Sequence, residues 1–349
     1  MVTDRAAFPG CAAVGTVPPM THSNAVDGIA WSRIGRGPIL GWRLAGRAKR
    51  RWLLSEHISM IAGPMSEQDS IGLHPRLNIG TSSFSDESWI GPFYPAGTKP
   101  ADMLPYYATK FSTVEVDSTY YRAPSLSMCQ RWHGVTPAGF RFSLKVPSEI
   151  THKKALVGAE KDWESFIQAV DALGPKLAYL VLQFPYWNLK SAIPSVKEFI
   201  TRLDGFTSKN KAPCPLVVET RNPKWISKEL LDFLKGRNLI LALQDQQWMP
   251  RPKQLWEKWG DALKTGQDIY IRMLGERENI EKLTETWDKI VIDRSEQTAE
   301  WMPIVRDMLA REQDVSMYFN NHYEGHAPAS IEKLKATWKT GFTAPVEPN

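Results

Sequence analysis

LVVETRNPKWISKELLDFLKGRNLILAL, residues 216–243, contains the unit from which the fold can be predicted. It begins with an apolar, β-branched run over residues 216–220 and ends with a second apolar run over residues 239–243. Continuous apolar runs are typical of strands that are covered on both faces, as in a parallel sheet. Between them, residues 228–238 place leucine and phenylalanine at the spacing of one helix face. The stretch therefore predicts a strand, a helix and a second, parallel strand.

The same alternation recurs over most of the chain. Helical spacing of apolar residues also appears at residues 102–111, 161–173, 195–203 and 298–313. Repetition of strand and helix eight times predicts an α/β protein with a (β/α)8 barrel of the TIM type, formed as a single domain over residues 76–342. The eight candidate strands are LNIGT (77–81), TVEVD (113–117), FRFSLKV (140–146), YLVLQF (179–184), LVVET (216–220), LILAL (239–243), IYIRM (269–273) and SMYFN (316–320).

An open, doubly wound sheet is the alternative architecture for this pattern. Sheets of that kind often carry a glycine-rich phosphate loop after the first strand. Neither G-x-G-x-x-G nor a P-loop follows LNIGT in this chain. The sequence therefore favours the barrel.

Residues 1–65 differ from the rest in composition and charge. They hold 8 basic and 3 acidic residues, which accounts for the whole net charge of +5, and they show no sustained strand or helix period. We expect a disordered, basic extension outside the fold. It could be an arm for a membrane surface, a nucleic acid or targeting, or simply residues added by an upstream start, because Met60 and Met65 both precede the first strand.

The remaining charge and the cysteines limit the class of protein. From Ser66 onward 35 basic residues face 35 acidic ones, so the barrel has no general attraction for phosphate backbones. No apolar run reaches the roughly 18 residues of a spanning helix, so we expect no membrane insertion. Cys11, Cys129 and Cys214 have no metal-site spacing, which fits a reducing compartment and a cytoplasmic location.

Polar side chains follow nearly every candidate strand. In a barrel of this type, the carboxyl ends of the strands and the loops after them build the active site. We therefore expect a shared site at this end. The candidate catalytic residues are Glu115, Glu219, Asp245 and His152, and the candidate ligand-binding residues are Thr81, Ser82, Tyr120, Lys145, Gln183, Arg221, Arg272, Asn320 and Asn321.

Charged residues inside apolar strands allow a second interpretation. Burying an uncompensated charge costs several kcal/mol, so Glu115, Glu219 and Arg272 must be either paired or used. Internal ion pairs of Glu115 or Glu219 with Arg221 or Arg272 would have a structural role only. A ring of polar groups from eight strands is instead typical of barrel enzymes.

Seven segments between Leu77 and Ser330 combine polar and aromatic residues at or after the candidate strands: GTSSFSDESWIGPFYP, TVEVDSTYYRAPS, FRFSLKVPSEITH, LVLQFPYW, VVETRNPKW, YIRMLG and MYFNNHYEGHAPAS. Together they resemble the YecE-like family, also called domain of unknown function 72. The resemblance implies a TIM-type barrel and points to the same strand-end residues, apart from Asp245. It implies little about activity. The chain departs from the family pattern at the pair Tyr120 and Tyr121 and at Ser330.

Three functions remain open. The first is an enzyme, such as a hydrolase or lyase, or a binder of a small polar or anionic ligand, in which Arg221, Arg272 and Lys145 hold the anion. Glu115 and Glu219 would then be the acid and base. The second is a nucleic-acid-binding or phosphodiester-processing barrel of the endonuclease kind, which the balanced charge disfavours. The third is a scaffold with a degenerate site.

A bound catalytic metal is not expected. His152, His322 and His326 lie near the strand ends, but they do not form H-E-x-x-H or a comparable ligand pattern. Gly325 and Pro328 place the last two histidines in a loop, where capping or packing is the simpler role. The sequence names no cofactor and no oligomeric state.

Overall fold

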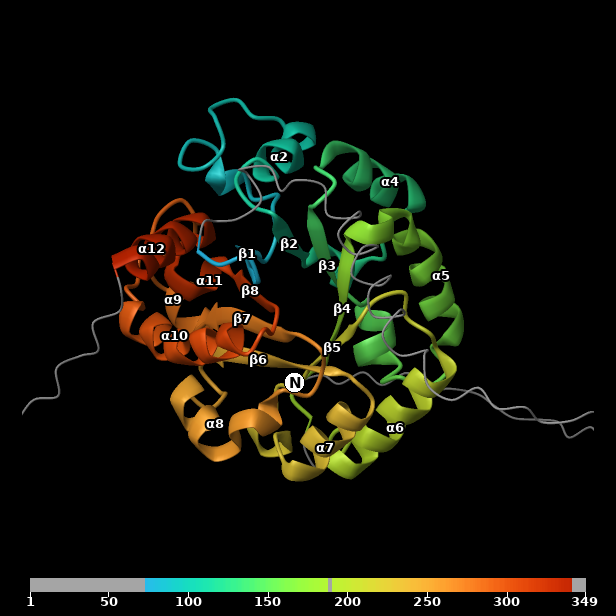
Figure 1. Ribbon diagram of the computed structural model, residues 1–349. Coiled ribbons are helices and arrows are strands. Elements are labelled where there is room, and N and C mark those ends of the chain that lie inside the picture. The colour runs from blue at the N-terminus through green and yellow to red at the C-terminus, as the bar shows by residue number, and fades with distance from the viewer. Residues whose placement is uncertain (1–72, 188–189, 341–349) are drawn as a thin grey trace, which may run out of the picture. The chain divides into compact units, whose positions relative to one another are not determined.

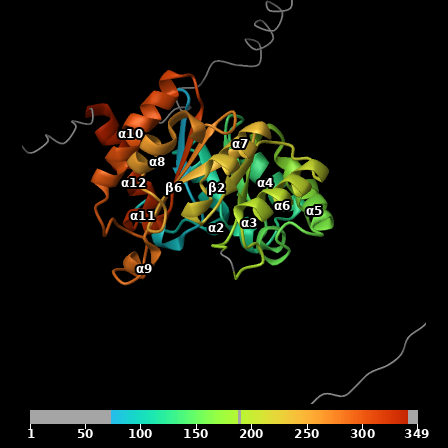
Figure 2. The ribbon, with the colours of Figure 1, turned by 90° about the horizontal axis from the view of Figure 1, so that it is seen from below.

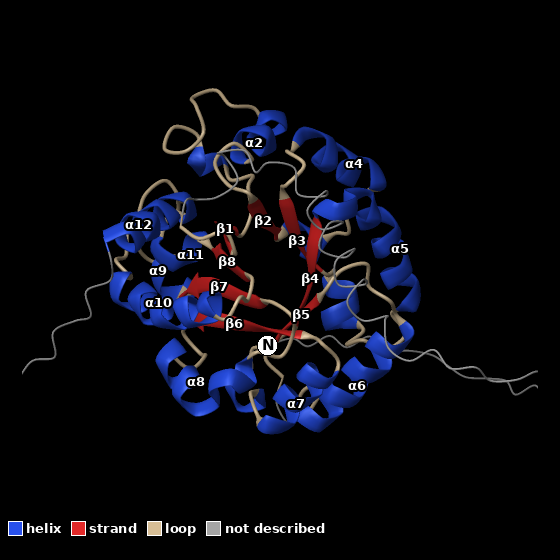
Figure 3. Cartoon of the chain, viewed as in Figure 1, coloured by secondary structure: helices blue, strands red, loops and turns tan. Residues whose placement is uncertain are grey.

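A computed structural model describes residues 73–187 and 190–340, and the expected extension over residues 1–65 lies outside them. The barrel has eight strands. They lie in the centre and are ringed by helices (Figures 1 and 3). The view turned by 90° shows helices on both sides of the strands (Figure 2). The strands are β1 Leu77–Thr81, β2 Thr113–Val116, β3 Arg141–Lys145, β4 Leu177–Gln183, β5 Leu216–Glu219, β6 Ile240–Gln246, β7 Ile269–Gly275 and β8 Val315–Phe319.

The helices follow the strands along the chain. The longer ones are α2 Pro100–Tyr107, α4 Leu126–Val135, α5 Glu160–Val170, α6 Val196–Lys209, α7 Lys228–Gly236, α8 Pro252–Trp259, α10 Ser295–Ala310 and α12 Ala327–Thr340. Short helical segments are η1 Glu87–Trp89, α3 Ser118–Tyr121, η2 Glu149–Lys153, η3 Asp171–Lys176, η4 Pro223–Trp225, η5 Gly260–Leu263, α9 Arg277–Ile280 and α11 Asn321–Glu324.

Serine side chains begin three of the helices. Ser125, Ser195 and Ser227 each accept a hydrogen bond from the backbone N–H three residues further on, at 3.2, 3.2 and 3.3 Å. Such a cap satisfies one of the backbone donors that the first turn of a helix leaves free. The bonds fix where α4, α6 and α7 begin.

All strand pairs are parallel, in the order β1-β8-β7-β6-β5-β4-β3-β2. The remaining seam, between β1 and β2, is held by a bridge of Ser82 with Glu115. A Cβ on Gly80 would lie 2.2 Å from the carbonyl oxygen of Thr113, so only glycine permits this close approach. The nearly closed barrel with its flanking helices confirms the predicted (β/α)8 fold.

The core has two layers. The helices bury their apolar faces against the outside of the strands, in the larger cluster of buried residues. Inside the barrel, Tyr179, Tyr270 and Tyr318 pack with small aliphatic side chains. Their hydroxyls meet Asp268, Ser143 and Thr113 at 3.0, 2.6 and 2.8 Å. These rings fill the barrel beneath its mouth.

The eight predicted strands match the observed ones to within three residues at each end. Helices were predicted over parts of α2, α5, α6, α7 and α10, whereas α4, α8 and α12 were not predicted. Within residues 73–187 and 190–340, no helix is both long enough and apolar enough to cross a bilayer.

Candidate functional site

A cavity of about 430 Å³ lies at the carboxyl ends of the strands. Six of the predicted site residues line it: Tyr120, Lys145, Gln183, Arg221, Arg272 and Asn320. Asp117, Gln246, Arg277 and His322 line it as well, although the predicted set did not contain them. The strand ends therefore bring polar side chains from β2 to β8 around one space.

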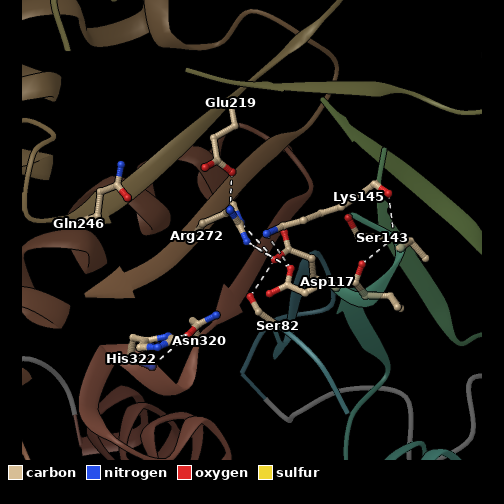
Figure 4. Close-up of polar contacts among 12 residues, drawn as sticks. Ser82, Asp117, Ser143, Lys145, Glu219, Gln246, Arg272, Asn320 and His322 are labelled. Carbon is tan, nitrogen blue, oxygen red and sulfur yellow. Dashed lines mark hydrogen bonds and ion pairs between the residues drawn. The ribbon is translucent and has the colours of Figure 1, made fainter. Parts of the chain in front are cut away.

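Arg272 on β7 lies at the bottom of this cavity and is fully buried. Its Nη2 lies 2.6 Å from Oε1 of Glu115 and 3.6 Å from Oδ1 of Asp117, and its Nη1 donates to Oε2 of Glu219 (Figure 4). A buried guanidinium needs such partners, because an unpaired charge there costs several kcal/mol. Arg272 thus forms internal ion pairs with Glu115 and Glu219, as the second interpretation of these charges expects.

Glu115 is fully buried and does not line the cavity. Besides Arg272, it accepts hydrogen bonds from the hydroxyls of Ser82, at 2.8 Å, and Tyr270, at 2.6 Å. Both carboxylate oxygens are therefore occupied by the protein itself. Ser82, predicted to bind ligand, holds this carboxylate in place.

Glu219 is also fully buried, between two arginines. Its Oε1 lies 2.6 Å from Nε of Arg221, and its Oε2 accepts from Arg272. Burial alone would raise the pKa of Glu219, but Arg221, Arg272 and Lys145 outweigh it and lower the pKa to about 2. Glu219 is ionised at neutral pH and cannot donate a proton there.

Lys145 and Asp117 form a pair in the cavity wall. Nζ of Lys145 lies 2.9 Å from Oδ1 of Asp117, whose side chain is 25% exposed. Burial would raise the pKa of Asp117, but Lys145 and then Arg272 lower it below its usual range. Among the described residues that line the cavity, Asp117 is the one with a carboxylate, since Glu115 and Glu219 do not line it. The signal for it was in the sequence, because Asp117 stands two residues after Glu115 in TVEVD.

Arg221 is the most open of the predicted cations, with 29% of its side chain exposed. Its Nη1 donates to Oε1 of Gln246 at 2.7 Å, and Gln246 in turn donates to Gln244 at 3.0 Å. Among the residues that the structure describes, these contacts and the pair with Glu219 leave Nη2 free. The guanidinium is thus held firmly with one edge available. Gln246 was missed because β6 continues three residues beyond the predicted strand.

His152 lies beside the cavity without lining it. Its ring packs edge-on against Tyr120, with ring centres 5.0 Å apart, and its Nδ1 lies 2.9 Å from the Thr151 hydroxyl. Burial and then the charge of Arg221 lower the pKa of His152 to about 4. The imidazole is therefore neutral at physiological pH and supports Tyr120.

Asp245, Thr81 and Asn321 were expected at the shared site, but they do not line the cavity and bond to other parts of the barrel instead. Asp245 lies between two inward-facing glutamines of β6 and accepts from Nε1 of Trp301 at 3.0 Å, because side chains alternate along a strand. Thr81 bonds with the hydroxyl of Tyr107 at 2.9 Å. Asn321 accepts from Nε1 of Trp89 at 3.2 Å and donates to Asp86 at 2.8 Å. All three join the barrel to its surrounding elements.

The segment after β8 forms a further part of the wall. His322 lies in the short helix α11, its Nδ1 2.5 Å from Oδ1 of Asn320 (Figure 4) and its Nε2 3.2 Å from Glu281. Gly275 makes room for this turn, since a Cβ there would lie 2.3 Å from the His322 carbonyl oxygen. His326 instead packs against Trp89, in keeping with the packing role predicted for it.

The described part of the chain contains no group of three or more His, Cys, Asp and Glu side chains placed to hold a metal ion. The side chains that line the cavity are chiefly cationic, amide and aromatic groups. Such an arrangement can hold an anionic group and donate hydrogen bonds to it.

Comparison with known sequences identifies relatives over the barrel. A family model described as "Protein of unknown function DUF72" matches residues 78–349. The UPF0759 protein YecE of Escherichia coli K12 is 29% identical over 152 residues, which is 44% of this chain and 51% of the relative. The UPF0759 protein YunF of Bacillus subtilis is 26% identical over 180 residues, or 49% of this chain and 61% of the relative. The chain thus matches about half of these curated relatives' length.

Solved structures confirm the fold. A DUF72 family protein from Thermotoga maritima has a TM-score of 0.60 and 24% identity, covering 76% of this chain and 99% of that one. A DUF72 family protein from Enterococcus faecalis has a TM-score of 0.55 and 21% identity, covering 76% and 97%. The family resemblance inferred from the sequence motifs is confirmed.

Proposed function

The chain belongs to the DUF72 family of proteins of unknown function, and from the cavity of this member we propose that the barrel mouth binds a small anionic ligand. Arg221 and Lys145 hold the anionic group. Gln183 and Asn320 supply further polar contacts from neighbouring strand ends. The supporting observation is that Lys145 and Arg221 line the cavity with cationic N–H donors that their ion pairs do not use.

Four cations and one carboxylate are found among the described residues that line the cavity: Lys145, Arg221, Arg272 and Arg277 against Asp117. Arg272 is neutralised from behind by Glu115 and Glu219. Arg277 is paired with Glu281 at the surface. Lys145 and Arg221 are left with unused donors toward the cavity, which an anionic ligand can accept.

If the bound ligand reacts, Asp117 is our candidate proton acceptor. It lines the cavity, and its lowered pKa keeps it ionised at neutral pH. A hydrolase or lyase needs such a group within reach of the ligand. We assign Glu115 and Glu219 to holding Arg272 instead, because both are engaged in buried ion pairs.

We also propose a cytoplasmic location for the protein. Cys129 and Cys214 are free thiols, and Cys129 is buried in the core. Free cysteines persist most readily in a reducing compartment.

Calorimetric titration with inorganic phosphate, succinate and ribose 5-phosphate tests anion binding, with neutral ribose as the matched control ligand. We expect at least one anion to bind. Arg221→Gln should weaken that binding about tenfold or more, because a charge-assisted hydrogen bond contributes about 1.5–3 kcal/mol. Arg221→Lys should weaken binding less than Arg221→Gln does, because lysine keeps the positive charge beside Glu219 although it lacks the planar guanidinium group.

Arg141→Gln is the matched control variant. Arg141 begins β3 at the opposite end of the barrel and donates to the Pro175 carbonyl. This variant should bind as the wild type does. If no anion bound better than ribose, or if Arg221→Gln bound as tightly as the wild type, the proposed function would be wrong.

A further inference from the structure

Exposed aromatic side chains gather at the barrel mouth. Among residues 73–187 and 190–340, the exposed ones are Tyr121, Tyr186 and Trp248, with 80%, 56% and 66% of their surface accessible. They follow β2, β4 and β6, so each lies at the carboxyl end of a strand. All three therefore lie at the end of the barrel that carries the cavity.

Tyr121 differs from the other two because it lines the cavity. Its ring meets Tyr120 edge-on, with ring centres 5.1 Å apart and an angle of 88°. Tyr120 also packs edge-on against His152. The Tyr121 ring is thus supported at its edge by a rigid group, while most of its surface stays accessible to a ligand.

Gln183 provides an independent observation in the same cavity. Its Oε1 is buried but has no hydrogen-bond partner within the described residues. Buried acceptors are rarely left unsatisfied, so a ligand that fits here should bring an N–H or O–H donor. A fully ionised carboxylate such as succinate has no such donor, whereas a nucleobase and its ribose carry several.

We propose that the ligand of the anion site is a nucleoside monophosphate. Its phosphate binds Arg221 and Lys145, its base stacks on Tyr121, and a sugar or base donor reaches Gln183. A cavity of about 430 Å³ lies within the usual range for ligands of this size. This inference rests on the proposed function, because it names the class of the same small anionic ligand.

A single nucleotide fits this mouth better than a nucleic-acid strand. Strand-binding proteins combine aromatic platforms with a positively charged groove along the phosphate backbone. From Ser66 onward the chain balances 35 basic residues against 35 acidic ones, so such a groove is not favoured. Among the described residues that line the cavity, Arg221 and Lys145 are the cations with donors left for a ligand.

Calorimetric titration with three matched ligands tests the inference: adenosine 5′-monophosphate, ribose 5-phosphate without the base, and adenosine without the phosphate. Adenosine 5′-monophosphate should bind about tenfold more tightly than ribose 5-phosphate, because one stacked base contributes about 1–3 kcal/mol. Tyr121→Ala should remove that advantage and leave the affinity for ribose 5-phosphate unchanged.

Tyr186→Ala is the matched control, since Tyr186 is an exposed tyrosine at the mouth that does not line the cavity. It should bind adenosine 5′-monophosphate as the wild type does. If ribose 5-phosphate bound as tightly as the nucleotide, the proposed stacking of the base on Tyr121 would be wrong, whereas the proposed anion binding would remain supported. If neither phosphate bound, the nucleotide inference would fail, and the proposed function would fail with it only if inorganic phosphate and succinate also bound no better than ribose.

A single-stranded oligothymidylate gives the remaining arm of the experiment. Its affinity should be no higher than that of one nucleotide. The oligothymidylate could instead bind more tightly, with an affinity that falls steeply with salt and is lost in Tyr186→Ala or Trp248→Ala. That result would show that the ligand is a nucleic-acid strand and not a mononucleotide.

Discussion

Arg272 shows at the scale of one residue how the barrel keeps a charge in its interior. The guanidinium is fully buried and meets Glu115, Glu219 and Asp117. Glu115 stands 157 positions earlier in the chain. The sequence could show that such charges need partners, but it could not choose between pairing and catalysis. That choice depends on distances that only the closed barrel fixes.

Arg272→Ala should destabilise the protein strongly. Removing one member of a buried ion pair costs about 3–5 kcal/mol, because Glu115 and Glu219 would be left buried without this partner. The free energy of unfolding in urea measures the effect. Arg277→Ala is the matched control, since Arg277 is exposed and paired with Glu281 on the surface, where such a pair contributes at most about 1 kcal/mol. Equal stabilities of the two variants would contradict the role of Arg272.

Strand β6 shows what periodicity predicts at the scale of an element. Its apolar run was predicted, but the strand continues to Gln246. Extension of the strand places Gln246 in the cavity wall and turns Asp245 outward, to Trp301 of α10. The apolar pattern ends before this point, so it could not show on which side Asp245 lies.

Two of the three helices missed in the sequence, α4 and α8, bury few side chains. Of the residues in α4, Cys129 and Trp132 are buried, and in α8 the buried residues are Pro252 and Leu255. Predicted helices such as α7 bury three leucines at helical spacing. The small number of buried side chains accounts for α4 and α8. It does not account for α12, which is longer and buries Ile331 and Leu334 in the core.

Asp245→Ala should weaken the contact between β6 and α10 without affecting the cavity. Loss of the carboxylate leaves the indole N–H of buried Trp301 unpaired, at a cost of about 1–3 kcal/mol. Asp245→Asn retains an acceptor and should lose less. Thermal unfolding and anion titration on the same samples separate the two effects. Reduced ribose 5-phosphate affinity in folded Asp245→Ala would show that this residue belongs to the site after all.

At the scale of the whole molecule, the sequence predicts the fold better than the site. Eight apolar strands and their order follow from local patterns, and the barrel places all the strand ends at one rim. Which side chains reach the cavity depends on strand alternation, on ion pairs between distant strands and on short helices after the strands, such as α9 with Arg277. Thr81 and Asn321 accordingly hold the scaffold, while Asp117 and His322 reach the cavity.

The most direct test of anion binding at the mouth uses the protein as purified from cells. Native mass spectrometry of the full chain, followed by analysis of the small molecules released on denaturation, should find a small anion in the wild type. The same anion should be depleted in Arg221→Gln and retained in Arg141→Gln. A wild type without any bound anion, or an anion equally abundant in the Arg221→Gln variant, would contradict the account.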